Sequence, residues 1–399
     1  MKRIIKYKAL NLLAISFIFL MVMISCGEIT EPVKQNNDIT HECVKPDSLG
    51  DGWGVDYPLN VGLDESMLMK MLDYLNKKEH RIHSILIVKN GKLVFEEYFH
   101  GYKFADDPPG SNGEYISYKH DEIHYLASIS KSVTSTVFCI AVDKGFISGV
   151  DKKLVDEMPQ YSSVLKDNKA NITLKHLLTM TAGLAWDESS YPYGDTRNDV
   201  TALFYKSNPI SFILSKPLLT NPGTSFLYSS GCPNVIAHLI TEKTGMNFLS
   251  FAKKYLFDPL EIEDFQWQKI SGQYYFASGG LWLYPRSLAK IGFLYLNNGF
   301  WKGEKIISGE NISQSIYRSV TLSGSNVCNG YGYYWWTNSK TIGSRVFDYV
   351  FAAGWGEQFL YLVPGENMLV IFNCGYFTDP TTVSPHYIFS DYILQALKN

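Results

Sequence analysis

The sequence predicts an α+β fold: an antiparallel sheet flanked by N- and C-terminal helices, with an inserted, mainly helical lobe. Three observations predict it. Strand patterns lie towards both ends of the folded segment, helical patterns and loops fill the middle, and an amphipathic helix lies at each end. Strands from the two ends then share one sheet that the terminal helices cover. We expect a site in the cleft between the two lobes.

The composition is that of a large folded protein without a basic surface. Of the 399 residues, 46% are apolar and 19% are charged, which supplies a sizeable core and too little charge for a disordered chain. The formal net charge is −3, whereas nucleic-acid binding needs a basic surface. Nucleic acid is therefore not an expected partner.

The N-terminus is typical of an export signal that ends at a lipid-attachment cysteine. Basic residues at positions 2, 3, 6 and 8 precede an apolar run over 9–24, which is short for a bilayer span. The run ends in Met-Ile-Ser-Cys26, which resembles the bacterial lipoprotein signal. We expect 1–25 to be a signal peptide and Cys26 to anchor the protein by lipid to a membrane of the bacterial cell envelope, on the periplasmic or cell-surface side. A signal-anchor helix with an incidental cysteine is the alternative.

A polar tether over 26–60 is predicted to lead into a folded segment over 61–399. The tether is rich in Asn, Asp, Gly and Pro. After it, apolar residues at positions 68, 71, 72 and 75 share one helix face. Strand patterns over 84–89 and 92–99 follow, joined by Asn90-Gly91, a strong hairpin signal.

The end of the chain supplies the remaining strands. Patterns typical of strands lie over 346–353, 359–363 and 368–373, and an amphipathic stretch over 389–397 predicts the C-terminal helix. The predicted α/β lobe therefore comprises 61–125 and 271–399. The predicted helical lobe comprises 126–270.

Motifs exclude several chemistries and leave one. The sequence has no Gly-x-Ser-x-Gly, phosphate-loop, Gly-x-Gly-x-x-Gly or His-Glu-x-x-His motif, and its cysteines are scattered, so no metal or organic cofactor is implied. What remains is Ser-x-x-Lys, which places a serine and a lysine on one helix face. The lysine amine can take the serine proton when burial lowers its pKa. The motif occurs at Ser128/Lys131, Ser163/Lys166, Ser250/Lys253 and Ser287/Lys290.

Its context distinguishes Ser128 from the other three serines, for which a helix cap or a solvated face is the simpler interpretation. Ser128 lies in the segment 125–135 (YLASISKSVTS), before an apolar helical run. A helix that begins at Ser128 puts the hydroxyl at its positive end. Lys131 in the first turn, in place of an acid, also departs from the ordinary capping box.

The run around Ser128 resembles the nucleophile box of the serine β-lactamase and penicillin-binding-protein superfamily, on its class C-like branch of esterases, D-peptidases and 6-aminohexanoate-oligomer hydrolases. The resemblance extends from about residue 63 to the C-terminus and implies a β-lactamase/transpeptidase-like fold. Further segments agree with this family in order: 173–187 (TLKHLLTMTAGLAWD), 222–230 (PGTSFLYSS), 277–286 (ASGGLWLYPR), 331–336 (YGYYWW) and 352–358 (AAGWGEQ).

The resemblance implies an acyl-enzyme mechanism. Ser128 would attack a carbonyl, and Lys131 and Tyr228 would form the proton relay. The backbone N–H groups of Ser128 and Trp355 would hold the oxyanion. Gly354 would permit close approach of its strand to the substrate. A core role for Tyr228 and a bulge at Gly354 are the structural alternatives.

The resemblance also implies residues that bind substrate. Ser230 stands where the family usually has Asn, and its hydroxyl is expected to hydrogen-bond Lys131 or an intermediate. Five aromatic residues are expected to wall the cleft, unless they belong to the core: Trp186, Tyr191, Tyr193, Trp336 and Trp355.

One departure from the family limits the substrate. Where β-lactamases and D-peptidases commonly have Lys-Thr-Gly or His-Thr-Gly, this chain has Ala352-Ala353-Gly354, which lacks the group that would bind a substrate carboxylate. We therefore expect a small-molecule or peptide-like ester or amide without an essential acid group. The alternatives are a cell-wall D-peptidase or weak β-lactamase, and a non-catalytic scaffold that binds cell-wall fragments or a partner.

Overall fold

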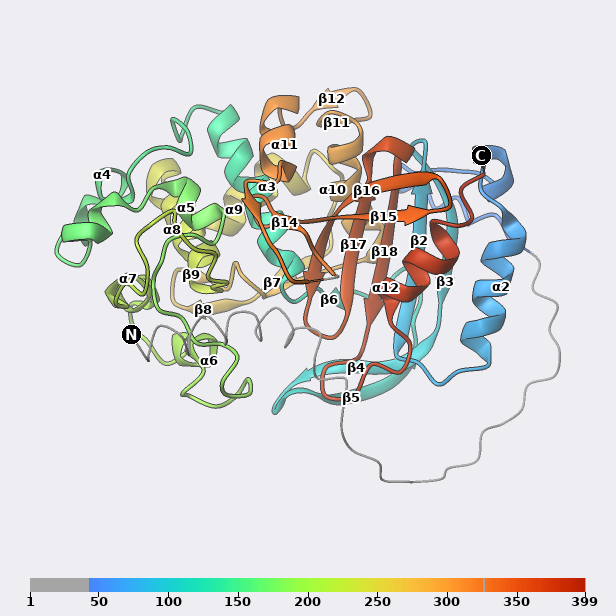
Figure 1. Cartoon of the computed structure of the whole chain (residues 1–399), viewed down its shortest axis with the longest axis horizontal. Coiled ribbons are helices and arrows are strands. Elements are labelled where there is room, and N and C mark those ends of the chain that lie inside the picture. Colours follow the sequence, from blue (N-terminus) through green and yellow to red (C-terminus); the bar gives the residue numbers. More distant parts are fainter. Residues whose placement is uncertain (1–42, 326, 399) are drawn as a thin grey trace.

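The computed structural model describes residues 43–325 and 327–398 (Figure 1). The predicted signal peptide, Cys26 and the first part of the predicted tether lie outside these residues. Within them, no helix combines the length and the apolar character that crossing a membrane requires.

A mainly antiparallel sheet joins the two ends of the folded chain (Figure 1). Its strands are β1 (Gly54–Val55), β2 (Ile82–Lys89), β3 (Lys92–Tyr98), β13 (Val320–Thr321), β14 (Gly330–Tyr331), β15 (Trp336–Ile342), β16 (Arg345–Gly354), β17 (Gln358–Val363) and β18 (Met368–Cys374). They lie in the order β1-β3-β2-β18-β17-β16-β15-β14-β13. The pairing of β2 with β18 places the N-terminal strands beside the C-terminal ones, which confirms the predicted α+β class. Among the described strands of this sheet, β1 and β3 form the one parallel pair.

The turn between β2 and β3 is the predicted hairpin. Asn90 and Gly91 have φ values of 52° and 75°. A two-residue turn with positive φ at both positions matches the right-handed twist of the strands that it joins, and Asn-Gly adopts it at low cost. The local sequence therefore sets the register of this strand pair.

Helices fill the segment between the two groups of strands and also close the chain. The α-helices are α2 (Glu65–Asn76), α3 (Ile129–Asp143), α4 (Leu154–Glu157), α5 (Leu174–Leu178), α6 (Asp199–Leu203), α7 (Pro209–Ser215), α8 (Gly231–Thr244), α9 (Phe248–Ala252), α10 (Pro285–Leu296), α11 (Gly309–Ile316) and α12 (Pro385–Ile388). Short 3-10 segments are η1 (Pro58–Val61), η2 (Pro159–Tyr161), η3 (Asp167–Asn171) and η5 (Pro364–Glu366), and π-helical turns are η4 (Lys253–Phe257) and η6 (Phe389–Ile393).

Small sheets lie outside the central one. A long hairpin of β4 (His100–Asp106) and β5 (Pro109–Ser117) follows β3 and projects from one end of the central sheet (Figure 1). The other small strands are β6 (His124–Tyr125) with β10 (Leu281–Leu283) and β7 (Phe265–Trp267), β8 (Lys269–Ser271) with β9 (Tyr274–Tyr275), and β11 (Phe300–Trp301) with β12 (Glu304–Lys305).

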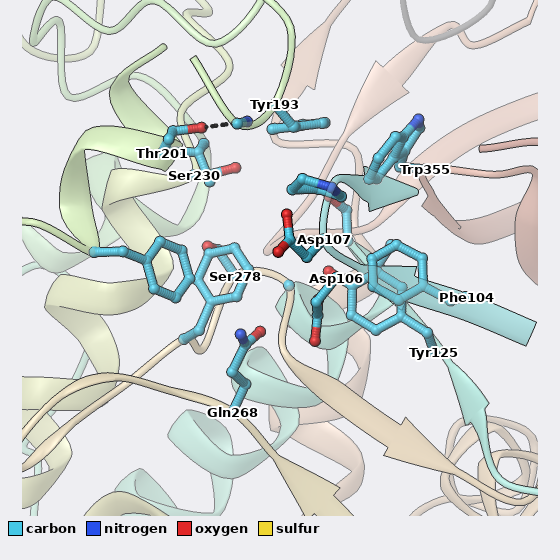
Figure 2. A pocket seen from close by; sticks show the side chains of 18 of the residues that line it. Phe104, Asp106, Asp107, Tyr125, Tyr193, Thr201, Ser230, Gln268, Ser278 and Trp355 are labelled. Atoms are coloured by element: carbon cyan, nitrogen blue, oxygen red, sulfur yellow. Dashed lines mark hydrogen bonds between the residues drawn. The ribbon is translucent and has the colours of Figure 1, made fainter. Parts of the chain in front are cut away.

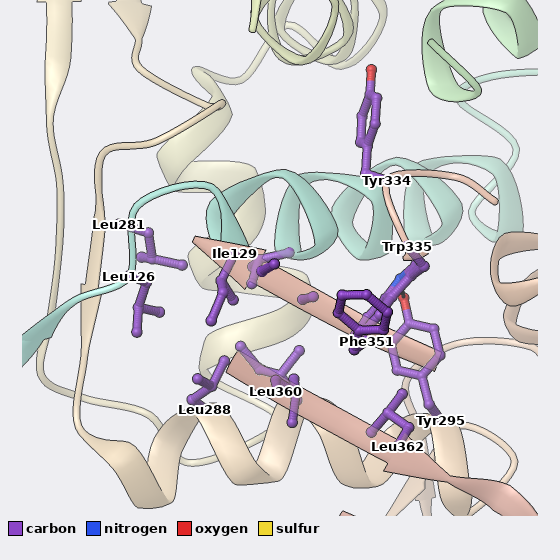
Figure 3. Packing of buried hydrophobic residues seen from close by; sticks show 14 of the residues in the cluster. Leu126, Ile129, Leu281, Leu288, Tyr295, Tyr334, Trp335, Phe351, Leu360 and Leu362 are labelled. Carbon is purple, nitrogen blue, oxygen red and sulfur yellow. Dashed lines mark hydrogen bonds between the residues drawn. The ribbon is translucent and has the colours of Figure 1, made fainter. Parts of the chain in front are cut away.

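Helices cover both faces of the central sheet. On one face, α3 and α10 contact β16, β17 and β18. Figure 3 shows Ile129 of α3, Leu288 of α10 and Leu360 of β17 in this buried layer. On the other face, the rings of Tyr361 and Phe389 stack at 4.0 Å, and α2 packs beside the C-terminal helical segment. Consecutive residues of a strand point to opposite faces, so β17 supplies both layers.

Helix α3 is buried along its length although it is rich in Ser and Thr. Its hydroxyl groups are paired: Ser132 Oγ donates to the carbonyl of Tyr334 at 2.6 Å, and Thr134 Oγ1 donates to that of Ala277 at 2.8 Å. Such bonds offset the cost of burying polar groups. They also fix α3 against the segments around it, so its N-terminal end is a rigid support.

The last part of the predicted tether packs against the globule. The Trp53 side chain is 4% exposed, and its Nε1 donates to the carbonyl of Arg286 at 3.2 Å. The next two residues form β1 beside β3. The folded domain of the described chain therefore begins before residue 61.

Candidate active site

Ser128 stands at the N-terminal end of α3, after a strained residue. Ala127 has a φ of 46°, in the left-handed region that side chains other than glycine rarely adopt. The Ser128 hydroxyl makes no capping hydrogen bond to α3. Its side chain is partly exposed and lines a cavity. The turn therefore presents this hydroxyl to the cavity.

The Lys131 amine contacts the Ser128 hydroxyl. Its Nζ donates to Ser128 Oγ at 2.7 Å and to the carbonyl of Ser278 at 2.8 Å. The Lys131 side chain is buried, and this burial lowers its pKa to about 8, against the opposing effect of the Glu188 negative charge. A minor neutral fraction of this amine therefore exists at neutral pH, and it grows as the pH approaches 8.

The lysines or serines of the other three Ser-x-x-Lys motifs lie in other surroundings. Lys290 Nζ donates to the carbonyl of Leu260 at 2.9 Å, Lys253 pairs with Asp258, and Ser163 lies on the exposed surface. Among the four motifs, all within the described residues, a serine–lysine hydrogen bond is present in the candidate pair alone. The structure therefore distinguishes Ser128/Lys131 from the other three motifs, as the sequence context predicted.

The Tyr228 side chain, from the loop before α8, lies beside Ser128 and Lys131. Lys131 Nζ lies 5.0 Å from the centroid of its ring, and the ring stacks on that of Trp336 at 5.9 Å. Burial and the charge of Glu188 raise the pKa of Tyr228, and a hydrogen bond with Ser128 opposes this. The phenol therefore stays protonated at neutral pH. The hydroxyl, amine and phenol come together here.

Gly354 lets the end of β16 lie against the backbone of the nucleophile. A Cβ at this position would lie 2.4 Å from the carbonyl oxygen of Leu126 and 3.1 Å from the nitrogen of Ser128. Such an approach excludes any side chain. Within the described residues, the N–H groups of Ser128 and Trp355 donate no hydrogen bond. Two adjacent donors are therefore free to bind an oxyanion.

Ser230 lines the cavity and is tied to Lys131 through Asn234. The Nδ2 of Asn234 donates to the Ser230 carbonyl at 2.8 Å and to Ser278 Oγ at 3.3 Å. Its Oδ1 accepts the N–H of Ser278 at 3.3 Å. Because the Ser278 carbonyl holds Lys131, this amide links the segment after Tyr228 to the base.

The cavity at Ser128 has a volume of about 340 Å³ (Figure 2). Ser128, Ser230 and Trp355 all line it. Trp186 and Trp336, expected as walls, are not among the described residues that line it. Trp186 Nε1 instead donates to Glu188 at 2.5 Å, and Trp336 supports the Tyr228 ring. Both tryptophans therefore act on the site through other residues.

A family model described as beta-lactamase matches residues 77–386, most of the chain. The chain belongs to this beta-lactamase family. It is therefore a serine hydrolase, and the resemblance inferred from the sequence is confirmed.

Relatives with assigned activities agree with this family. The 6-aminohexanoate-dimer hydrolase of Paenarthrobacter ureafaciens is 21% identical over 352 residues, 83% of this chain and 82% of that protein. The lovastatin esterase of Penicillium rubens is 28% identical over 180 residues, 40% of this chain and 43% of that protein, so less than half of the esterase is matched. The structure of a putative 6-aminohexanoate-dimer hydrolase from Bacillus anthracis superposes with a TM-score of 0.62 at 21% identity, over 82% of this chain and 80% of that one. This likeness confirms the β-lactamase/transpeptidase-like fold.

In this family member, Glu188 is a site residue that sequence reasoning missed. Its Oε2 accepts the backbone N–H of Ser230 at 2.9 Å and the indole N–H of Trp186. Its charge raises the pKa of both Lys131 and Tyr228. The sequence feature that could have indicated Glu188 is its position two residues after Trp186, directly after the segment 173–187 that resembles the family.

Proposed function

We propose that this beta-lactamase family member is an exported, lipid-anchored hydrolase that cleaves an ester or amide through an acyl-enzyme on Ser128. One observation carries the catalytic part: the 2.7 Å hydrogen bond between Lys131 Nζ and Ser128 Oγ, made by a buried amine whose pKa is lowered to about 8. The export signal and the lipid on Cys26 rest on the sequence of residues 1–26.

Lys131 is the base of the first step. As its neutral amine accepts the Ser128 proton, Oγ attacks the substrate carbonyl. Tyr228 keeps its own proton at neutral pH, so it does not compete as a base. It lies beside both groups and passes a proton to the leaving oxygen or nitrogen, taking one from Lys131 in return.

The two free N–H groups supply electrostatic stabilisation. The tetrahedral intermediate places a negative oxygen between the backbones of Ser128 and Trp355, which Gly354 holds close together. Collapse of the intermediate releases the alcohol or amine and leaves the acyl-enzyme. Water then enters the cavity, gives its proton to the same relay and hydrolyses the acyl-enzyme.

The cavity favours substrates without a carboxylate. Ala352 and Ala353 are buried and offer no charged group, and the described residues that line the cavity include no Lys or Arg. A carboxylate would enter without a partner, at the cost of its desolvation. The names of the two relatives, an esterase and an amide-dimer hydrolase, agree with an ester or amide substrate.

Intact-mass analysis with three probes tests the catalytic proposal. The mature protein and Ser128→Ala are incubated with a fluorophosphonate, a penicillin and p-nitrophenyl esters. We expect phosphonylation that Ser128→Ala abolishes, together with ester turnover. A long-lived penicilloyl adduct without ester turnover would instead favour a D-peptidase or weak β-lactamase, and no adduct of any kind would favour a non-catalytic scaffold.

Metabolic labelling tests the anchor. In a bacterial host given labelled palmitate, the full chain is expected to take up label and to fractionate with membranes. Cys26→Ala should abolish both. Label retained by Cys26→Ala would contradict lipidation at this residue.

A further inference from the structure

The cavity at Ser128 carries two carboxylates opposite its nucleophile. Asp106 and Asp107, at the tip of the β4–β5 hairpin, line it and point inwards (Figure 2). The described residues that line the cavity include no Lys or Arg. Lys131 lies behind Ser128 and does not line the cavity, and its single charge does not offset two carboxylates. The space that a substrate occupies is therefore negative.

Packing of the hairpin tip fixes the position of these carboxylates. Gly110 has a φ of 83°, and a Cβ there would lie 2.5 Å from the Trp355 indole. On the other side, a Cβ on Gly194 would lie 3.4 Å from Cδ of Pro109. The tip is thus held between the residue after β16 and the loop of the helical lobe. It forms one wall of the cavity, where Asp106 and Asp107 are also exposed to solvent.

Within residues 43–325 and 327–398, the two carboxylates have no partner. Among the described residues, neither the Asp106 nor the Asp107 side chain makes a hydrogen bond or an ion pair, whereas Lys103 of the same hairpin pairs with Glu122 at 3.0 Å. Partial burial raises the pKa of Asp106, which reflects the cost of an uncompensated charge there. A ligand of opposite charge would remove that cost.

Aromatic rings next to the carboxylates add a second attraction for cations. Phe104 and Tyr125 stack at 4.2 Å, and Tyr193 and Trp355 lie 4.8 Å apart, and all four line the cavity. Ring faces attract ammonium groups, more strongly where water is excluded. Carboxylates and aromatic faces around one space are chemistry suited to an organic cation.

We propose that the substrate of Ser128 is a cationic ester or amide, whose ammonium group binds between Asp106, Asp107 and the aromatic rings. The proposal rests on the hydrolase function above and narrows its substrate class. The cation belongs either to the acyl group or to the leaving group. The carboxylates bind this group and take no part in bond breaking.

Matched substrates that differ only in charge test the proposal. For the acyl side, p-nitrophenyl trimethylammoniobutyrate is compared with the isostere in which carbon replaces nitrogen, and with p-nitrophenyl hemiglutarate as the anionic member. For the leaving group, acetylthiocholine is compared with its carbon isostere. Each kcat/KM is divided by the rate constant for hydroxide hydrolysis, which removes differences in intrinsic reactivity.

We expect kcat/KM for the cationic member of one pair to exceed that of its neutral isostere by about tenfold or more, and the anionic ester to be the poorest acyl substrate. The pair that shows the preference assigns the cation to the acyl or the leaving group. The preference should fall as NaCl is raised, because salt screens charge. Ratios near one in both pairs would overturn the proposal.

Variants of the hairpin test which carboxylates cause the preference for a cationic substrate. The double variant Asp106→Asn/Asp107→Asn should bring the charge ratio close to one, and each single variant should reduce it in part. Glu114→Gln removes a carboxylate of the same hairpin that does not line the cavity, and it should leave the ratio at its wild-type value. An equal loss in Glu114→Gln would overturn the assignment to the cavity.

The outcomes separate this proposal from the function on which it rests. Neutral esters hydrolysed through a phosphonylatable Ser128, with no charge preference, would refute the cationic substrate and leave the hydrolase intact. Absence of both labelling and turnover would refute the two together.

Discussion

The Glu188 carboxylate accepts the backbone N–H of Ser230 at 2.9 Å, at the N-terminal end of α8. The Ser230 side chain does not cap that helix. Glu188 therefore supplies, from a separate loop, the negative group that a helix N-terminus favours. The charge of Glu188 also raises the pKa of Lys131 and Tyr228. Glu188 is therefore a positioning residue that holds the segment after Tyr228 and also affects the protonation of the base.

Glu188→Gln is expected to move the acid limb of the pH profile to lower pH. The neutral Lys131 amine is the active form, so kcat/KM rises as pH rises through its pKa. Removing the negative charge favours the neutral amine and lowers that pKa, which shifts the limb down by about half to one unit. The measurement is kcat/KM for a neutral ester from pH 5 to 10.

Glu188→Asp is the matched control, since it keeps the charge. A merely structural role for Glu188 would lower kcat/KM at all pH values without moving the limb. An unmoved limb in Glu188→Gln, or one displaced to higher pH, would contradict the electrostatic role.

Gly354→Ala is expected to impair both stability and catalysis. Its Cβ would lie 2.4 Å from the Leu126 carbonyl, so β16 or the turn before Ser128 must move. We expect a loss of about 1–3 kcal/mol in the free energy of unfolding, and a loss of about 100-fold in kcat/KM from displacement of the nucleophile and the oxyanion donors. Urea unfolding measures the first effect, and the kinetics of p-nitrophenyl ester hydrolysis measure the second.

Gly365→Ala controls for the added methyl group. A Cβ at Gly365 would have no atom within 4 Å, and this glycine lies in the turn between β17 and β18. It should change stability and activity little. Wild-type activity in Gly354→Ala would mean that β16 does not constrain the nucleophile.

The parts of the site that the sequence predicted are those encoded locally. A serine and a lysine three residues apart on a helix must face the same way, so the contact between Ser128 and Lys131 follows from helix geometry alone. The Asn90-Gly91 turn is equally local. Tyr228 lies far away in the sequence, and it was placed because the segment around it resembles the family.

The parts that escaped prediction depend on contacts between distant segments. Asp106 and Asp107 reach the cavity because their hairpin packs against Trp355, and neither carboxylate carries a sequence signal of that contact. Trp186 and Trp336 show the converse. A tryptophan that walls a cavity and one that supports a neighbouring side chain have the same sequence signature.

Trp53→Ala tests whether the domain begins inside the predicted tether. The Trp53 ring is buried edge-on against Trp301 and Phe293, with centroids 5.1 and 5.6 Å away. Truncating a buried indole leaves a cavity, so the free energy of unfolding in urea should fall by about 3 kcal/mol or more. Leu59→Ala removes a side chain that is 53% exposed in the same segment and should cost less than about 0.5 kcal/mol. If both variants changed the free energy of unfolding by the same small amount, the residues up to 60 would be a tether, as the sequence predicted.

Stability is expected to fall as pH is lowered from 6.5 towards 4. Burial lowers the pKa of His80, His124 and His386 to about 4, against an ordinary value near 6.5. These histidines stay neutral in the folded protein while the unfolded chain takes up protons. Their contribution is therefore complete above pH 6.5 and is lost as pH falls through the folded value, by up to about 1.4 kcal/mol per pH unit for each.

His386→Gln should flatten this pH dependence. His386 Nδ1 bonds the Tyr361 hydroxyl at 2.9 Å on the face of the sheet remote from Ser128, so the change spares the site. The variant is less stable than wild type at pH 7, since that bond is altered. Between pH 7 and 4, however, its free energy of unfolding should fall by up to about 3 kcal/mol less than that of wild type, because one proton-linked group is gone. Urea unfolding at half-unit intervals measures both curves, with His120→Gln as the control for an exposed imidazole. Parallel curves for wild type and His386→Gln would show that His386 is not held neutral by burial.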